Sequence, residues 1–95
     1  MREVVIERRL VQGVRDLGGL AWKFDTRTRD LPDRLILLPG GQVRFVEVKR
    51  PGQVPRPGQM RILARLQALG FQAGWVASAA EVDRVLTELQ EQGDG

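Results

Sequence analysis

The fold is decided by the stretch Asp33-Arg34-Leu35-Ile36-Leu37-Leu38-Pro39-Gly40-Gly41-Gln42-Val43-Arg44-Phe45-Val46-Glu47-Val48-Lys49. Its first apolar run, 35–38, is typical of a buried strand, and the segment 43–49 reads as a returning strand. The sequence Pro39-Gly40-Gly41 between the two runs is a turn signal. The stretch therefore predicts a β-hairpin that brings Asp33, at the start of the first strand, back beside Glu47.

The rest of the chain supplies three helices and two more strands. We expect helices at about 2–17, 57–69 and 79–89, and strands at 20–24 and 71–77. Gly18-Gly19 and Gly70 are C-cap signals, Pro57 suits a first helical turn, and Ser78 with Glu81 forms a capping box. The order α-β-β-β-α-β-α predicts one α/β domain over residues 1–95 with a mixed central sheet. We expect the tail, 90–95, to fray.

Three apolar stripes define the faces of the helices that we expect to turn inward. Their residues are Val4, Leu10, Val11, Val14 and Leu17, then Ile62, Leu63, Leu66 and Leu69, and finally Val82, Val85, Leu86 and Leu89.

Composition excludes several kinds of protein. The 95 residues include neither Cys nor His, which removes zinc fingers, Ser/His/Asp triads and His-based nucleases. No apolar run approaches the roughly 20 residues of a membrane span, and the N-terminus does not resemble a signal peptide. We expect a cytoplasmic protein without a membrane partner. A net charge of +3 is compatible with a polyanionic partner.

Glu47 and Lys49 are two residues apart on a strand, so their side chains leave the same face. A turn with an odd number of residues would set Asp33 opposite Glu47, and an even one would place them diagonally. Two neighbouring carboxylates repel each other at neutral pH unless a cation lies between them. In a chain without His or Cys, oxygen ligands favour a hard ion such as Mg²⁺ or Mn²⁺.

Lys49 stands out because only it and Lys23 are lysines among the 15 basic residues. A lysine beside a cation can position water or stabilise a developing anion. The alternative is that Glu47 and Lys49 are only the polar side of an edge strand.

Glu7 falls within the apolar stripe of the first helix, where a lone carboxylate is costly to bury. A metal-site role would explain it. The alternatives are an ion pair with Arg8 or Arg15, a side chain that reaches solvent, or replacement in the metal role by Glu3.

With these residues in place, the sequence resembles the VRR-NUC (virus-type replication-repair nuclease) family of the PD-(D/E)XK nuclease superfamily. The resemblance runs from about Ile6 to Leu86. It is carried by Ile6-Glu7-Arg8-Arg9-Leu10, Gly18-Gly19-Leu20-Ala21-Trp22-Lys23-Phe24, Pro32-Asp33-Arg34-Leu35-Ile36-Leu37-Leu38-Pro39-Gly40-Gly41, Phe45-Val46-Glu47-Val48-Lys49 and Gln59.

The resemblance implies a restriction-endonuclease-like fold, a Mg²⁺ or Mn²⁺ cofactor and a set of site residues. Glu7, Asp33 and Glu47 would be metal ligands, together with the backbone carbonyl of Val48. Lys49 would be the catalytic lysine and Gln59 a further active-site residue. Stand-alone members, from phages and bacteria, resemble Holliday-junction resolvases and are homodimers.

Positive side chains near the predicted site are candidates for DNA contacts. Arg27, Arg29, Arg50 and Arg56 fall in predicted loops flanking the site, and the resemblance adds Lys23. Loop arginines are more often only solvated charges, and a surface lysine that reaches solvent is the more common case for a residue such as Lys23.

Two positions depart from the family pattern. Asp30 stands where members usually have Gly, and Arg56 stands where the next helix usually begins with Ser or Thr. An extra carboxylate at Asp30 could perturb the metal site or change how DNA approaches.

The residues and the resemblance together predict a metal-dependent endonuclease of branched DNA in a bacterial or phage-infected cell. Its role in replication, repair or recombination stays open. We expect a two-fold dimer, since one domain holds one site and two strands must be cut. The alternatives are a DNA-binding module of the same fold without catalysis, and a monomeric nuclease of flap or single-stranded DNA.

Overall fold

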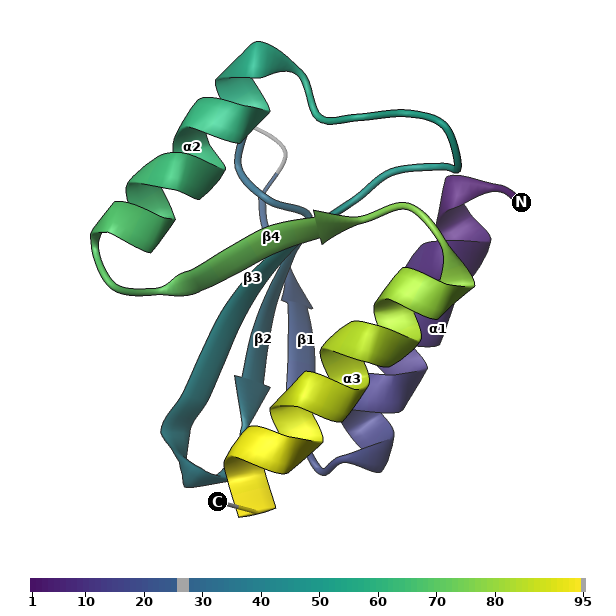
Figure 1. The fold of residues 1–95 in the computed structure, drawn as a ribbon, viewed down its shortest axis with the longest axis vertical. Coiled ribbons are helices and arrows are strands. Elements are labelled where there is room, and N and C mark those ends of the chain that lie inside the picture. The colour runs from purple at the N-terminus through teal and green to yellow at the C-terminus, as the bar shows by residue number, and fades with distance from the viewer. Residues whose placement is uncertain (26–27, 95) are drawn as a thin grey trace.

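The computed structural model describes residues 1–25 and 28–94 and has the expected order of elements (Figure 1). Its elements are α1 (Glu3–Asp16), β1 (Leu20–Lys23), β2 (Arg34–Leu38), a 3₁₀ turn η1 (Pro39–Gly41), β3 (Gln42–Val48), α2 (Pro57–Ala68), β4 (Gln72–Val76) and α3 (Ala79–Asp94). The α-β-β-β-α-β-α prediction is therefore confirmed.

The sheet is mixed, with strand order β1-β2-β3-β4. The first three strands pair antiparallel, and β4 lies parallel to β3. Leu38 pairs with Gln42 across a three-residue turn, and Arg34 pairs with Val46 at the other end of the hairpin. Continuing this register by one residue places Asp33 opposite Glu47, which is the odd-turn arrangement.

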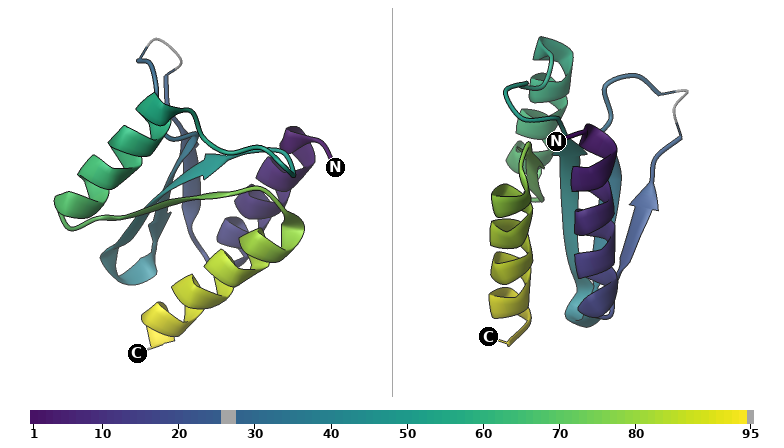
Figure 2. Two further views of the ribbon diagram at one scale, coloured as in Figure 1. Left: turned by 45° about the horizontal axis from the view of Figure 1, so that its top comes forward. Right: turned by 90° about the vertical axis from the view of Figure 1, so that its right-hand side faces the viewer.

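Helices α1 and α3 pack against each other and form the main core with one face of the sheet (Figures 1 and 2). Because side chains alternate along a strand, Ile36, Val46 and Val48 point into this core. Helix α2 packs beside β4, on the other side of the molecule from α1 and α3 (Figure 2). The second face of the sheet, which carries Asp33 and Glu47, is therefore only partly covered.

The apolar residues predicted to face inward from the helices are at least partly buried, except at two positions. Val4 is 42% exposed, and the fully buried residues of α1 are Ile6, Leu10 and Val14. These three are four residues apart, so the buried line on α1 begins at Ile6, which the predicted stripe omitted. Leu69 is also exposed because it follows the last residue of α2 as its C-cap.

The capping residues predicted at the helix ends take these roles in the structure. Gly18 and Gly70 have φ values of 85° and 97°, in the left-handed region that favours glycine. At the start of α3, the Glu81 N–H donates to Ser78 Oγ, while the Glu81 side chain accepts from the Ala77 N–H. Helix α3 continues through Asp94, so it includes most of the tail; fraying of that tail stays a prediction. None of the described helices is long and apolar enough to cross a bilayer.

Gly19 follows α1 and lies tightly against the hairpin. A Cβ there would lie 2.5 Å from the Leu37 carbonyl oxygen and would overlap the Leu38 side chain. We expect Gly19→Ala to lower the free energy of unfolding by about 1–3 kcal/mol, because the backbone must shift. Gly74→Ala is the matched control, since a Cβ there meets no atom within 4 Å. Urea denaturation checks this, and equal midpoints for the two variants would contradict it.

Candidate nuclease site

The end of the hairpin brings Asp33 and Glu47 together on the less covered face of the sheet. Asp33 Oδ2 accepts a hydrogen bond from the Val48 N–H at 2.7 Å, which fixes this carboxylate against the end of β3. The preceding residue, Pro32, is fully buried and restricts the backbone that delivers Asp33. Two acidic side chains thus face each other across neighbouring strands.

Glu47 is the most strongly perturbed group of the site. Only 2% of it is exposed, and its Oε2 is buried with no hydrogen-bond partner among the described residues. Burial, followed by the hydrogen bond and negative charge of Asp33, raises the pKa of Glu47 to about 8. The charge of Lys49 and a hydrogen bond with the Val48 backbone oppose this rise. Without an added positive charge, the site favours a protonated Glu47.

Lys49 and Val48 complete the cluster from the end of β3. The Lys49 side chain is half-buried and near enough to Glu47 to lower the pKa of that carboxyl. The backbone N–H of Lys49 donates to the Val76 carbonyl oxygen at 2.8 Å. The N–H and C=O of one strand residue point toward the same neighbour. The Val48 carbonyl is therefore directed to the side on which its N–H meets Asp33.

Gln59 is buried, 7% exposed, in the first turn of α2. Its Oε1 accepts a hydrogen bond from the Arg56 N–H at 2.8 Å. The glutamine therefore caps the helix with its oxygen, a role that the sequence analysis did not assign to it.

Glu7 pairs with two basic side chains in this structure. Its Oε2 binds Arg34 Nε at 2.8 Å and lies 3.9 Å from Lys23 Nζ. Arg34 neighbours Asp33 in the chain, so its side chain leaves the opposite face, toward α1. Its other contact, from Nη1 to the Ala21 carbonyl, holds it there.

No set of three or more carboxylates in the described parts of the chain is arranged to hold a metal ion. The expected alternatives for Glu7 named Arg8 and Arg15, and neither is its partner here. Nothing in the sequence marked Arg34 as that partner, because the pair depends on how α1 packs on the sheet.

The candidate DNA-contact residues within the described segments have different neighbours. Lys23 lies beside Glu7, and Arg50 lines a depression with the start of α1 at Arg2 and Glu3. Arg29 and Arg56 both approach Asp30, at 4.0 and 3.0 Å. Arg27 lies outside the described residues.

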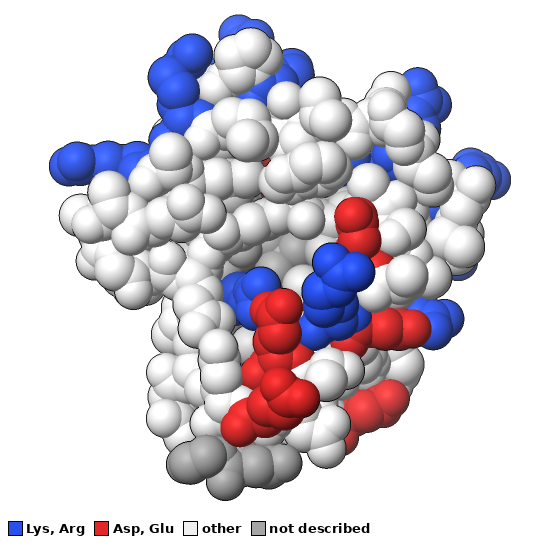
Figure 3. Space-filling view, viewed as in Figure 1, with Lys and Arg blue, Asp and Glu red and all other residues white. Residues whose placement is uncertain are grey.

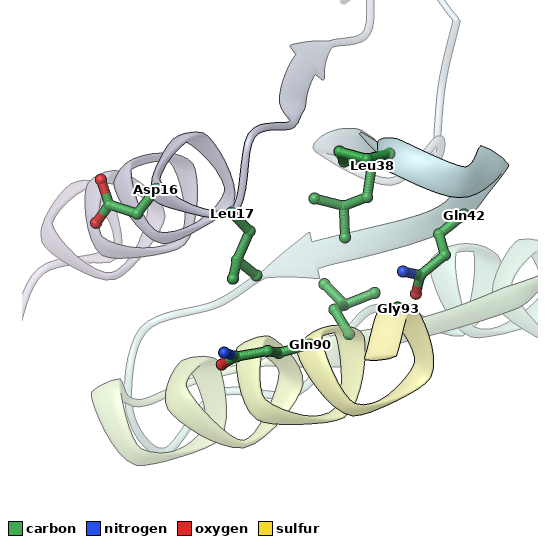
Figure 4. Close-up of a pocket in the computed structure, with 8 residues that line it drawn as sticks. Asp16, Leu17, Leu38, Gln42, Gln90 and Gly93 are labelled. Carbon is green, nitrogen blue, oxygen red and sulfur yellow. The ribbon is translucent and has the colours of Figure 1, made fainter. Parts of the chain in front are cut away.

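Positive charge nevertheless gathers at the end of the molecule that carries the site. Figure 3 shows basic side chains around the upper rim, where α2 begins, while the acidic side chains visible on this face lie mostly over α3. One pocket lies elsewhere, between α1, the hairpin turn and α3, and is lined by Asp16, Leu38 and Gln42, among others (Figure 4). Leu38 and Gln42 flank the hairpin turn, at the opposite end of both strands from Asp33 and Glu47.

Known proteins match both the sequence and the fold. Over 73 residues the chain is 52% identical to "Putative nuclease p44" of Acyrthosiphon pisum secondary endosymbiont phage 1, covering 76% of this chain and 78% of that protein. A solved structure described as "VRR_NUC domain" has a TM-score of 0.83 at 32% identity, covering 90% of this chain and 94% of the other. The chain belongs to the VRR-NUC family. No family model matches the sequence.

The two departures from the VRR-NUC pattern meet in space. Asp30 has φ 68°, the only positive value at a described non-glycine residue, which explains why glycine suits this position. Its Oδ1 accepts a hydrogen bond from Arg56 Nη2 at 3.0 Å. The Asp30 carboxylate also lies against α2, since a Cβ on Gly58 would overlap Asp30 Oδ2. The sequence showed both departures but gave no sign that they contact each other.

The raised pKa of Glu47 predicts a stability that depends on pH. The unfolded group titrates near 4.5 and the folded group near 8, so the fold favours the protonated acid. This stabilisation is complete below about pH 4.5 and is lost as the pH rises toward 8. In EDTA, we expect the urea midpoint to fall between pH 5 and 8, and Glu47→Gln to remove most of that fall. If the urea midpoint of Glu47→Gln falls with pH as steeply as that of the parent, Glu47 is not the group responsible.

Proposed function

We propose that this VRR-NUC domain is a divalent-metal-dependent endonuclease that hydrolyses phosphodiester bonds in branched DNA, in the manner of a Holliday-junction resolvase. The observation that carries the proposal is the pair formed by the half-buried Asp33 and the buried Glu47 beside Lys49, with one Glu47 oxygen lacking a partner among the described residues. The phage nuclease p44 and the VRR_NUC structure support the reaction class. The phage relative also favours a role in phage DNA processing in the infected cell.

The residues fit a hard divalent cation. Asp33, Glu47 and the Val48 carbonyl are all oxygen donors, and Mg²⁺ commonly binds one or two carboxylates while keeping positions for water and substrate phosphate. A cation would neutralise the two carboxylates and give the buried Glu47 Oε2 a partner. It would also reverse the preference for protonated Glu47.

When bound, the cation supplies Lewis-acid stabilisation of the charge that develops on the phosphate. Lys49 then presents a compact positive charge on the same face as Glu47, where it orients the attacking water or stabilises the developing anion. Val48 holds Asp33 in place through its N–H. Gln59 fixes the start of α2 next to the loop that carries Asp33.

Glu7 as a further metal ligand stays a prediction. It would have to exchange Arg34 for the cation, because the two are bound at 2.8 Å. Glu7→Gln should then weaken Mn²⁺ binding, as measured by calorimetry. If Glu7 serves only Arg34, affinity stays unchanged.

We further propose that the protein acts as a homodimer through its apolar sheet face, which we define as Leu20, Trp22, Leu35, Leu37 and Phe45. These residues are neighbours across β1, β2 and β3. None is charged, and Leu20 and Trp22 are 52% and 57% exposed. They share the side of the sheet with Asp33 and Glu47, so a two-fold pair would bring two sites together for two strands.

Light scattering tests the dimer. Trp22→Glu should convert it to a monomer, because the two-fold axis sets the new carboxylates near each other in an apolar interface. Leu69→Glu is the matched control, since Leu69 is 58% exposed at the end of α2, outside the apolar sheet face. A monomeric parent protein, or a dimer that survives Trp22→Glu, would contradict the proposed interface.

Cleavage assays test the chemistry and separate the alternatives. With Mn²⁺ or Mg²⁺ we expect cuts in a four-way junction but none in EDTA. Lys49→Ala should lower the cleavage rate by at least about 100-fold with little change in DNA affinity, because the lysine acts on the transition state. Preference for flap or single-stranded DNA by a monomer would favour the second nuclease hypothesis. Binding without cleavage in any divalent ion would favour a non-catalytic module.

A further inference from the structure

Asp30 and Arg56 join the two segments on either side of the candidate site. Asp30 lies three residues before Asp33, and Arg56 is the N-cap residue of α2, directly before Pro57. The guanidinium of Arg56 binds Asp30 Oδ1 at 3.0 Å, and Arg29 Nε lies 4.0 Å from the same oxygen. One carboxylate thus engages two of the arginines expected to meet DNA.

The placement of Asp30 is enforced by its surroundings. Its backbone is in the left-handed region, its side chain is only 23% exposed, and its Oδ2 lies against Gly58 in the first turn of α2. The positive end of a helix dipole favours an anion at this place. A carboxylate oxygen therefore lies where a guanidinium and a helix start would both favour an anionic oxygen.

Arg56 does not depend on Asp30 for its own place in the fold. Its N–H is capped by Gln59, and its side chain makes no capping bond in α2. The Arg56 side chain is 59% exposed, so its pair with Asp30 is accessible to solvent and weak. A second anion can therefore replace Asp30 at low cost.

We propose that Asp30 is a built-in competitor for the DNA backbone: its carboxylate occupies the place of a phosphate on Arg56, which a bound strand takes over. The inference rests on the proposed function, since it requires DNA at this end of the sheet. Its consequence is lower affinity for any DNA that does not present a phosphate beside α2. Asp30 is thus a residue that sets DNA affinity and selectivity, and it takes no part in the cleavage step.

The test is a double-mutant cycle on DNA affinity, measured in EDTA with a labelled duplex and a labelled four-way junction. Asp30→Asn removes the charge, and asparagine tolerates a positive φ. We expect it to bind DNA about three- to fivefold tighter than the parent. Arg56→Gln should weaken binding less than about twofold in the parent, but about fivefold or more in the Asp30→Asn background, where no carboxylate competes.

Asp83→Asn is the matched control. Asp83 forms an exposed pair with Arg9, at 2.8 Å between α1 and α3, so its loss makes the same change in net charge and also frees an arginine. We expect its DNA affinity to stay within about twofold of the parent. Asp30→Gly repeats the test with a residue suited to φ 68°, in case asparagine disturbs the loop.

The outcomes separate the inference from the proposed function. If the parent binds DNA but Asp30→Asn and Asp30→Gly bind no tighter, or if Arg56→Gln costs the same in both backgrounds, the competitor role is wrong and Asp30 only ties the loop to α2. An equal gain in Asp83→Asn would reduce the effect to net charge and overturn the inference too. If no version of the protein binds either DNA, the proposed function itself fails.

Discussion

The site depends on one unfavourable interaction, the burial of Glu47 directly against Asp33. A hairpin with a three-residue turn forces this contact, because its register sets the two positions opposite each other. The fold offers Glu47 the positive charge of Lys49 but leaves one of its oxygens without a partner among the described residues. A pair that costs stability in the metal-free protein is what a cation site requires, since the same repulsion becomes attraction to a divalent ion.

The two faces of the sheet have different roles. The face under α1 and α3 carries the buried aliphatic core, which holds β2 and β3 in register. The other face carries the acidic pair at one end and the apolar sheet face along the strands. Alternation along β2 separates Asp33 from Arg34, so one step in the chain separates the candidate site from the ion pair that holds α1.

Much of the fold and part of the candidate site could be predicted from the sequence. The hairpin and its acidic pair could be predicted because the apolar runs, the turn signal and the two-residue period are all local. The sequence allowed two arrangements of Asp33 and Glu47, directly opposite or diagonal, and the structure has them directly opposite. The partner of Glu7 could not be predicted, because a helical wheel gives a direction but does not say which residue of the sheet lies below it. The contact between Asp30 and Arg56 could not be predicted either, because it joins two residues in different loops that are 26 positions apart in the chain.

The central claim is that a divalent cation binds between Asp33 and Glu47. An anomalous difference map from a crystal grown with Mn²⁺ tests it most directly. We predict a peak at about 2.0–2.2 Å from an oxygen of each carboxylate and near the Val48 carbonyl, and its loss in Glu47→Gln. A map without a peak between these two side chains, at Mn²⁺ concentrations that support DNA cleavage, would contradict the account.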